Sequence, residues 1–301
     1  MALTFTETAY AKINLALHVR RRREDGYHEL ETLFAFVDAG DVLTAEPAAQ
    51  DSLHVVGEFS GLLAPSPPSL GGGVGGGGSA LSTVDPPSPA LPQGEGSILD
   101  NLVAKALNAL PRPQGLAVTL EKNLPVAAGL GGGSADAGAV FRMVEALHGL
   151  PDDWPARAAK LGADVPACVL SRTHIGLGTG TEQLAVEDDL AGTPVLLVNP
   201  RVPLSTGPVF KAWDGVDRGA LPEGPASRIA REGRNDLEAP AISLCPVIAD
   251  VLAALRDTTP WLARMSGSGA TCFALYDTTE ARDAAAAAMP EGWWTMTGRL
   301  R

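Results

Sequence analysis

The sequence has few cysteines and no long apolar run. Cys168, Cys245 and Cys272 are widely spaced, and none belongs to a CxxC pair. This pattern supports neither a disulfide framework nor a zinc site. No apolar stretch approaches the roughly 20 residues that a membrane helix needs. Residues 1–12 also lack the basic start and apolar run of a signal peptide, so we expect a cytoplasmic protein.

Basic residues are scarce relative to acidic ones. The 301 residues include 23 Lys and Arg against 35 Asp and Glu, a formal net charge of -12. An acidic surface repels nucleic acid backbones and anionic lipid headgroups, so neither nucleic acid nor a membrane is expected as a partner. A small anionic ligand is still compatible, because helix N-termini and a few basic side chains can make one pocket locally positive.

The order of predicted elements favours an α+β fold. Alternating residues over 4–20 predict a strand, a charged turn follows at 20–26, and residues 30–42 predict a second strand. Residues 61–96 are rich in Gly and Pro and cannot form a core, so a flexible insertion is predicted there. Further elements are predicted as helices at 98–110, 134–148, 151–161, 237–255 and 277–289, the last opened by a capping box of Asp277 and Glu280, and as strands at 115–124, 194–199 and 271–276.

Residues 125–136 carry the most informative pattern. Glycines at 129, 131, 132 and 133 let the backbone approach a ligand, and the helix predicted from Ser134 directs free N–H groups at the same place. The segment therefore predicts an anion site suited to phosphates. A lone glycine-rich loop can equally be a flexible connection in which Ser134 only caps the helix. It is not a Walker A motif, because the chain has no Gly-Lys dipeptide, so positive charge must come from elsewhere.

Three segments together resemble the motifs of the GHMP kinases, the superfamily of galacto-, homoserine, mevalonate and phosphomevalonate kinases. Residues 10–15 are similar to the first motif, 125–134 to the second and 265–275 to the third, in the expected order. The resemblance implies a small-molecule kinase that uses ATP and Mg²⁺. It also implies a ribosomal-S5-domain-2-like nucleotide domain over residues 1–165 and a ferredoxin-like C-terminal domain over 166–301, with the active site in the cleft between them.

Five further segments resemble one group of kinases within this superfamily: residues 12–15, 25–30, 100–102, 161–166 and 235–238. Within the superfamily they are most similar to the kinases that act on a cytidine diphosphate-linked methylerythritol in non-mevalonate isoprenoid biosynthesis. The resemblance thus implies ATP-dependent phosphorylation of the 2-hydroxyl of this small molecule.

The same resemblance makes Lys12 and Asp164 the catalytic pair. A carboxylate can accept the proton of a crowded tertiary alcohol, and a nearby lysine keeps it ionised and offsets charge on the transferred phosphoryl group. Taken singly, Lys12 fits a surface lysine on a strand edge and Asp164 fits a turn or helix cap. Nucleotide binding is implied for the whole loop, namely Pro125, Val126, Ala127, Ala128, Gly129, Leu130, Gly131, Gly132, Gly133 and Ser134.

Substrate binding is implied for Asn14, Tyr27, His28 and Phe210. Tyr27 is expected to stack on cytosine while His28 hydrogen-bonds its edge, with Phe210 closing the other side of the base. Asn14 is expected to bind polar groups of the substrate near Lys12. Without the resemblance, Tyr27 and His28 would be a hairpin aromatic and a surface imidazole, and Asn14 a turn contact.

Two positions depart from the family pattern. Tyr10 stands where a proline is common, which affects strand entry, and Ala135 replaces a second serine, which puts one hydroxyl contact to phosphate or metal in question. Asp136 is expected in the first helical turn as a capping acid. A role for Asp136 in magnesium binding is left open, and no metal ligands are predicted.

Two alternatives stay open beside the cytidylyl-type kinase. One is another GHMP kinase, of the homoserine or mevalonate type, whose acceptor has no base to explain Tyr27, His28 and Phe210. The other is a non-catalytic nucleotide-binding protein on the same fold, which would need neither Lys12 nor Asp164. The oligomeric state is not predicted.

Overall fold

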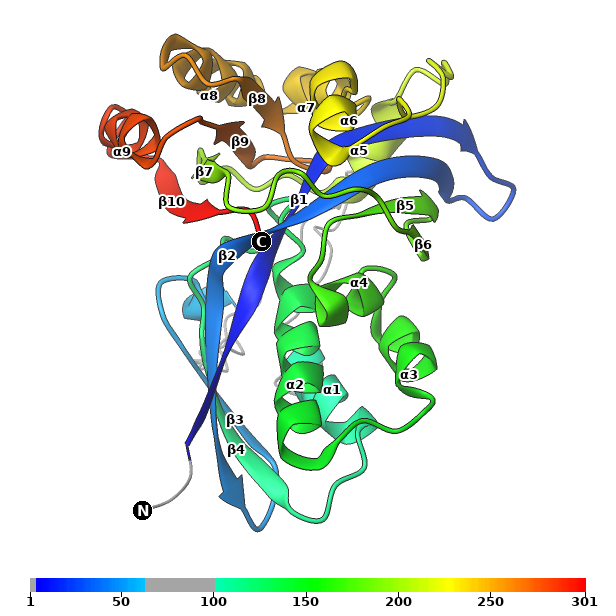
Figure 1. Ribbon diagram of the computed structural model, residues 1–301, viewed down its shortest axis with the longest axis vertical. Coiled ribbons are helices and arrows are strands. Elements are labelled where there is room, and N and C mark those ends of the chain that lie inside the picture. The colour runs from blue at the N-terminus through cyan, green and yellow to red at the C-terminus, as the bar shows by residue number, and fades with distance from the viewer. Residues whose placement is uncertain (1–3, 63–100) are drawn as a thin grey trace, which may run out of the picture.

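Two long N-terminal strands organise the computed structural model, which describes residues 4–62 and 101–301. β1 (Phe5–Arg22) and β2 (His28–Ala48) pair antiparallel along almost all of their length. Figure 1 shows them running along the long axis, with α1 to α4 beside one half and the C-terminal elements gathered at the other end. The predicted strands at 4–20 and 30–42 are confirmed. Both run further into the hairpin, where opposite charges such as Arg21 and Glu29 face each other across the strands.

The first sheet is built around β2. Its order is β3 (Ser52–Val56), β4 (Gly115–Glu121), β2, β5 (His174–Gly178) and β6 (Glu182–Leu184), and β1 also pairs with β2. β4 pairs with the second half of β2 and β5 with its first half. β5 and β6 follow residue 165 in the chain yet belong to this sheet. The division of the chain into domains at residue 165 stays a prediction.

Helices cover the half of the first sheet that lies away from the C-terminal elements. They are α1 (Leu102–Ala109), α2 (Gly132–His148), α3 (Trp154–Leu161) and α4 (Val165–Leu170), with a short 3-10 helix at Ser60–Leu62. Val140 and Phe141 of α2 pack with Phe36 and Leu120 of the sheet in one apolar core. The helices predicted at 98–110, 134–148 and 151–161 correspond to α1, α2 and α3. From residue 63 on, the predicted flexible insertion lies outside the described residues.

A second, antiparallel sheet forms the C-terminal part. Its order is β10 (Trp294–Arg299), β7 (Pro194–Asn199), β9 (Cys272–Leu275) and β8 (Leu262–Met265). The helices around it are α5 (Thr206–Ala212), α6 (Ala226–Glu232), α7 (Glu238–Leu244), α8 (Val247–Asp257) and α9 (Thr279–Ala287). The strands predicted at 194–199 and 271–276 are confirmed as β7 and β9.

One helix prediction in this part is confirmed and one needs correction. Residues 237–255 are mostly helical, as predicted, and form two helices, α7 and α8, because Pro246 interrupts the helical hydrogen bonds between them. The cap of α9 is Thr278 and not Asp277, since the Thr278 hydroxyl accepts the Ala281 N–H at 3.1 Å. The elements α5, α6, β8 and β10 were not predicted.

The two sheets share a central core. Ile13 and Leu15 of β1 pack with Leu197 of β7 and Phe273 of β9, and all four side chains are fully buried. This packing fixes β1 against both halves of the molecule, and it confirms the predicted α+β class. Among the helices of residues 4–62 and 101–301, none has the length and apolar character that a membrane crossing requires.

Candidate active site

The three predicted motifs meet at one place, the loop of residues 125–131 that leads into α2. The Lys12 N–H donates to the Leu130 carbonyl at 3.1 Å, which ties the loop to β1. From the other side, the Ser266 hydroxyl donates to the Gly129 carbonyl at 2.9 Å and the Thr271 N–H to the Ala128 carbonyl at 3.2 Å. Segments more than a hundred residues apart in the sequence thus form a single site.

Glycine is required at two positions of this loop. Gly129 has φ +77°, and a Cβ there would lie 2.4 Å from the Ser266 carbonyl oxygen. Gly131 has φ +64°, and a Cβ there would lie 2.9 Å from Cε of Lys12. Both φ values lie in the left-handed region, and both glycines are in close contact with neighbouring segments. The loop is therefore held in shape by its neighbours, which argues against a merely flexible connection.

The start of α2 provides the predicted anion site. The helix begins at Gly132, two residues earlier than predicted, with Gly131 as its N-cap. The first helical hydrogen bond runs from the Ala135 N–H to the Gly131 carbonyl at 2.8 Å, so the N–H groups of Gly132, Gly133 and Ser134 have no acceptor within the helix. Ser134 is consequently not the cap that the alternative interpretation required. Three free N–H groups at a helix N-terminus suit a phosphate.

Lys12 and Asp164 form an ion pair beside this loop. The Lys12 Nζ lies 3.1 Å from Asp164 Oδ2 and 4.4 Å from the centre of the Phe34 ring. Lys12 is 5% exposed, whereas the Asp164 side chain is 32% exposed, so the carboxylate has a free face. Asp164 occupies the N-cap position of α4, but its side chain makes no capping hydrogen bond. Its orientation toward Lys12 is what a catalytic pair needs.

Asn14 links β1 to the third motif. Its side-chain Oδ1 lies 3.5 Å from Lys12 Nζ, and its Nδ2 donates to the Thr32 hydroxyl at 2.8 Å. Its backbone N–H donates to the Ser266 hydroxyl at 3.2 Å. The pairing of β1 with β2 shifts register on either side of Lys12 and Asn14, and such irregularities redirect side chains. Thr32 was not predicted to belong to the site. The only feature of the sequence that could have indicated it is that Thr32 is a polar residue beside an apolar stretch of the strand.

The residues predicted to bind the base lie at the turn of the β1–β2 hairpin, or against it. The His28 ring lies 4.9 Å from the Phe210 ring and 5.8 Å from Trp213, so the structure brings His28 and Phe210 together. Tyr27 is 67% exposed at the hairpin tip. Burial, and then the charge of Arg22, lower the pKa of His28, which keeps its imidazole neutral. Trp213 is a neighbour of His28 that the sequence did not indicate.

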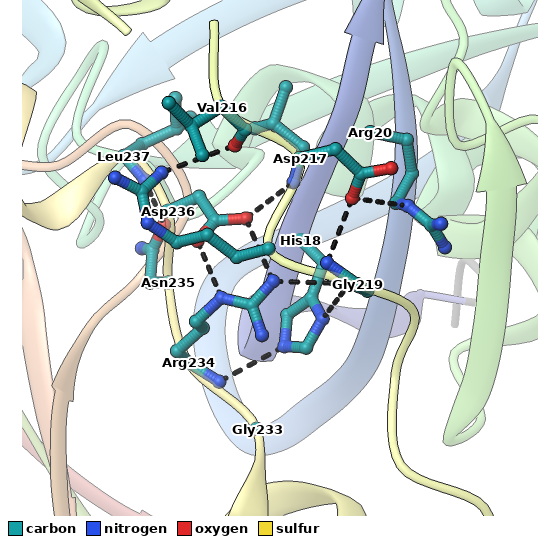
Figure 2. A network of polar contacts seen from close by, with 12 residues as sticks. His18, Arg20, Val216, Asp217, Gly219, Gly233, Arg234, Asn235, Asp236 and Leu237 are labelled. Carbon is teal, nitrogen blue, oxygen red and sulfur yellow. Dashed lines mark hydrogen bonds and ion pairs between the residues drawn. The ribbon is translucent and has the colours of Figure 1, made fainter. Parts of the chain in front are cut away.

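Residues 234–238 hold the third motif in place. The Asn235 Nδ2 donates to the carbonyls of Met265 and Gly267, both at 2.8 Å. Asp236 accepts the Val19 N–H at 2.8 Å and the Arg234 Nε at 2.7 Å, within the network that Figure 2 shows around His18. This segment carried part of the family resemblance, and its contacts explain why: it ties the third motif and β1 together.

Asp136 does not lie where it was expected. Because α2 begins at Gly132, Asp136 is the fifth helical residue, and the first turn contains no acid. Its carboxylate is buried and lies 2.8 Å from Lys122 Nζ, beneath the loop. The predicted role as a capping acid is therefore wrong.

Comparison with known proteins agrees with this geometry. The family model for the GHMP kinases N terminal domain matches residues 101–172, and the model for GHMP kinases C terminal matches residues 219–293. A 4-diphosphocytidyl-2-C-methyl-D-erythritol kinase of Novosphingobium aromaticivorans is 66% identical over 300 residues, which cover 100% of this chain and 94% of that protein. The kinase of the same name from Erythrobacter litoralis is 61% identical over 303 residues, covering 98% and 99%.

Solved structures extend the comparison to the fold. A crystal structure of 4-(cytidine 5'-diphospho)-2C-methyl-D-erythritol kinase has a TM-score of 0.76 and 31% identity, and the match covers 98% of this chain and 99% of that one. A homoserine kinase from Cytophaga hutchinsonii, at 16% identity and a TM-score of 0.57, shares the fold alone. With its three motifs meeting at one loop and relatives this similar over their whole length, the chain belongs to the 4-diphosphocytidyl-2-C-methyl-D-erythritol kinase family of the GHMP kinases.

Proposed function

We propose that this protein transfers the γ-phosphoryl group of ATP to the 2-hydroxyl of 4-diphosphocytidyl-2-C-methyl-D-erythritol, a step of non-mevalonate isoprenoid biosynthesis, with Lys12 and Asp164 as its catalytic pair. The observation that carries this proposal is the 3.1 Å ion pair of Lys12 and Asp164 directly beside the glycine loop. A protein that only bound a nucleotide would not need an amine and a partly exposed carboxylate at this point.

ATP would bind with its phosphates on residues 129–134. The N–H groups of Gly132, Gly133 and Ser134 would donate to phosphate oxygens, and Lys12 would supply positive charge that the loop itself lacks. Residues 125–128 would line the path of the nucleotide into this loop. The GHMP family uses ATP, so the donor follows from membership of the family.

Magnesium fits the site only if the nucleotide brings most of its ligands. The described residues contain no group of three or more His, Cys, Asp or Glu side chains that could hold a metal ion. Mg²⁺ commonly keeps several waters and is bound through substrate phosphates. We propose that it enters with ATP and neutralises phosphate charge.

The chemistry assigned to the pair is a direct phosphoryl transfer. Asp164 accepts the proton of the acceptor hydroxyl as the new oxygen–phosphorus bond forms, while the bond between the γ-phosphorus and the bridging oxygen breaks and ADP leaves. Lys12 pairs with Asp164 before the transfer and offsets negative charge on the phosphoryl group during it. Asn14, 3.5 Å from the Lys12 amine, would position the methylerythritol end of the acceptor.

We propose that the base is recognised at the turn of the β1–β2 hairpin. His28 lies at the first residue of β2, whereas Lys12 pairs with Phe36 eight residues further along the same strand. An acceptor that contacts both must be elongated, as a cytidylyl-linked alcohol is and homoserine or mevalonate is not. In the structure Phe210 lies against His28, so a base would insert next to these two rings, with Tyr27 closing the exposed side.

A coupled assay of ADP release distinguishes the alternatives. Pure protein is mixed with Mg²⁺ and ATP and, in turn, with the cytidylyl-linked alcohol, homoserine and mevalonate. Release with the cytidylyl acceptor alone, and a phosphomonoester on its 2-position in ³¹P spectra, is the expected result. Release with homoserine or mevalonate would support another GHMP kinase, and ATP binding without turnover on any acceptor would support the non-catalytic alternative.

A further inference from the structure

An ionic cluster lies buried directly beneath the glycine loop. Lys122, which follows β4, contacts Asp41 of β2 through Oδ2, and its Nζ lies 2.8 Å from Oδ2 of Asp136 in α2. The three residues are only 3%, 0% and 2% exposed. Two carboxylates thus share one ammonium group, so the cluster carries a net negative charge when all three are ionised.

The cluster lies close to the amides that we assign to phosphate binding. A Cβ added at Gly132 would lie 3.5 Å from Lys122 Nζ and 3.8 Å from Asp41 Oδ2. Gly132 is the first residue of α2, and its N–H is one of the three free donors of the loop. The charge of the cluster therefore acts on any anion bound there, because electrostatic interactions are strong at short range in a buried environment.

The two carboxylates are not equivalent. Asp41 accepts the backbone N–H groups of Asn123 and Leu124 on Oδ1, at 2.6 and 2.7 Å, and the Lys122 ammonium on Oδ2. Asp136 accepts from Lys122 on Oδ2, but its buried Oδ1 meets no donor in the part of the chain that the structure describes. Both oxygens of Asp41 therefore have donors. Asp136 shares the Lys122 ammonium with Asp41 but has one buried oxygen without a donor, so it is the carboxyl of the two that a proton would neutralise.

We propose that the pair of Asp41 and Asp136 carries one proton, on Asp136, while triphosphate occupies the loop, and that loss of this proton weakens ATP binding. With the proton, one negative charge balances the ammonium and the cluster is neutral. Without it, a net negative charge lies under the phosphates and counteracts the helix N-terminus. Asp136 is in this sense a positioning residue for the nucleotide, an inference that rests on the proposed ATP site.

The pKa of Asp136 agrees with a proton on this carboxyl. Burial raises the pKa of Asp136 to about 8, Lys122 opposes the rise, and Asp41 adds to it. The other titratable group that faces it, the thiol of Cys168 on α4, stays neutral, because burial and Asp164 raise its pKa to about 12. Lys12 and Asp164, whose charges also act on that thiol, form an ion pair and balance each other. The proton is therefore present below pH 8, is lost above it, and is retained to higher pH when triphosphate is bound.

Affinity for a non-hydrolysable ATP analogue with Mg²⁺, measured from pH 7.0 to 9.5, tests the proposal. This window lies above the last ionisation of a terminal phosphate, near pH 6. We expect the dissociation constant of the wild type to rise roughly tenfold across it, the scale of one buried charge near an anion. Asp136→Asn should bind as tightly as the wild type does at pH 7.0 and show no such rise. Asp153→Asn, an exposed change at the residue before α3, should follow the wild type.

A second measurement uses the unchanged protein and so does not depend on how the variant folds. Calorimetric titration with the analogue at pH 8.5, in two buffers of different ionisation enthalpy, should show uptake of roughly half a proton on binding. Binding that is independent of pH and takes up no proton would overturn this inference while leaving the ATP site intact. A dissociation constant that still rises with pH in Asp136→Asn would also overturn this inference. Failure of the wild type to bind the analogue at any pH would instead refute the proposed function.

Discussion

At the scale of single residues, the environment of Lys12 explains why a charged amine can be buried in the first strand. Asp164 balances its charge, the Phe34 ring lies beneath it, and the Asn14 amide oxygen lies within 3.5 Å. A buried lysine without such partners would lose its proton. The partly exposed carboxylate of Asp164 is left as the group that an alcohol can reach.

Replacing Asp164 should separate catalysis from binding. Asp164→Asn keeps the shape of the side chain but removes the proton acceptor, so we expect turnover to fall about 10²-fold or more, the usual scale for a general base. The affinity for ATP should stay near that of the wild type. Steady-state kinetics and equilibrium binding check this, with the exposed Asp152→Asn as control. Equal losses of binding and turnover would show that Asp164 has a structural role instead.

Removing the ring of Phe210 should affect the acceptor alone. Stacking of a base on an aromatic side chain is worth about 1–3 kcal/mol, so Phe210→Ala should raise KM for the cytidylyl acceptor by roughly tenfold or more. KM for ATP should not change, because the phosphate loop contacts β1 at Lys12, whereas Phe210 lies against His28 at the hairpin turn. Val216→Ala, an exposed change nearby, serves as control. An unchanged KM for the acceptor would remove Phe210 from the site.

At the scale of elements, the site depends on a turn and a loop that shape each other. The turn of residues 266–270 receives Asn235 on one side and contacts the Gly129 carbonyl on the other. Neither segment has a hydrophobic core of its own. Their conformation is determined by hydrogen bonds to each other and to β1, and it is preserved only where no Cβ intervenes.

Two glycines with the same φ allow the effect of this close approach on stability to be measured. Gly129 and Gly149 both have φ +77°, but a Cβ at Gly129 would lie 2.4 Å from the Ser266 carbonyl oxygen, whereas one at Gly149 would meet nothing within 4 Å. Gly149 combines φ +77° with ψ 163°, a conformation essentially confined to glycine, so Gly149→Ala should cost about 1–3 kcal/mol of unfolding free energy from the backbone alone. Gly129→Ala should cost about 1–3 kcal/mol more and reduce ATP affinity. Equal losses in denaturant titrations would contradict the close approach.

At the scale of the whole molecule, β1 connects the two halves through a network around a buried histidine. Its His18 lies between the loop at Gly219 and the start of residues 234–238, as Figure 2 shows. The His18 Nδ1 must carry the proton, because it lies 3.0 Å from the Gly219 carbonyl, and Nε2 accepts the Arg234 N–H at 3.2 Å. A protonated ring would place a second N–H against Arg234 and lose that hydrogen bond.

This network should make stability depend on pH. Burial lowers the pKa of His18 below its ordinary 6.5, so the unfolded chain binds more protons than the folded one below that pH. The free energy of unfolding should therefore fall as the pH drops from 7 to 5. His28 and His174 contribute with the same sign, since burial lowers the pKa of each.

The contribution of His18 can be isolated with a variant. Denaturant titrations at pH 5, 6 and 7 should show a smaller pH dependence for His18→Gln, whose amide cannot titrate, than for the wild type. The overall loss should be about 1 kcal/mol at pH 7, the worth of a hydrogen bond that is imperfectly replaced. His54→Gln, a change of an exposed histidine on β3, should behave as the wild type. If the free energy of unfolding of His18→Gln changed with pH as much as that of the wild type, His18 would be excluded as a source of the pH dependence.

Much of the site could be predicted from single segments, and the rest could not. The glycine loop, Lys12, Asn14 and Asp164 were predicted because each belongs to a short segment with a specific pattern. Their mutual contacts confirm that the segments meet, although their roles stay predictions. Thr32, Trp213 and Lys122 were not predicted, because a polar or aromatic residue in a strand or loop has no signal until its neighbours are known.

The amino-acid sequence by itself determined the α+β class, the long first strands, the glycine loop and the family, because local patterning and short motifs act within a few residues. Tertiary structure alone decided the contacts that no motif indicates. It placed Lys122 between Asp41 and Asp136 and moved the start of α2 to Gly132. These contacts join residues distant in sequence, so they depend on how the two sheets pack around β1.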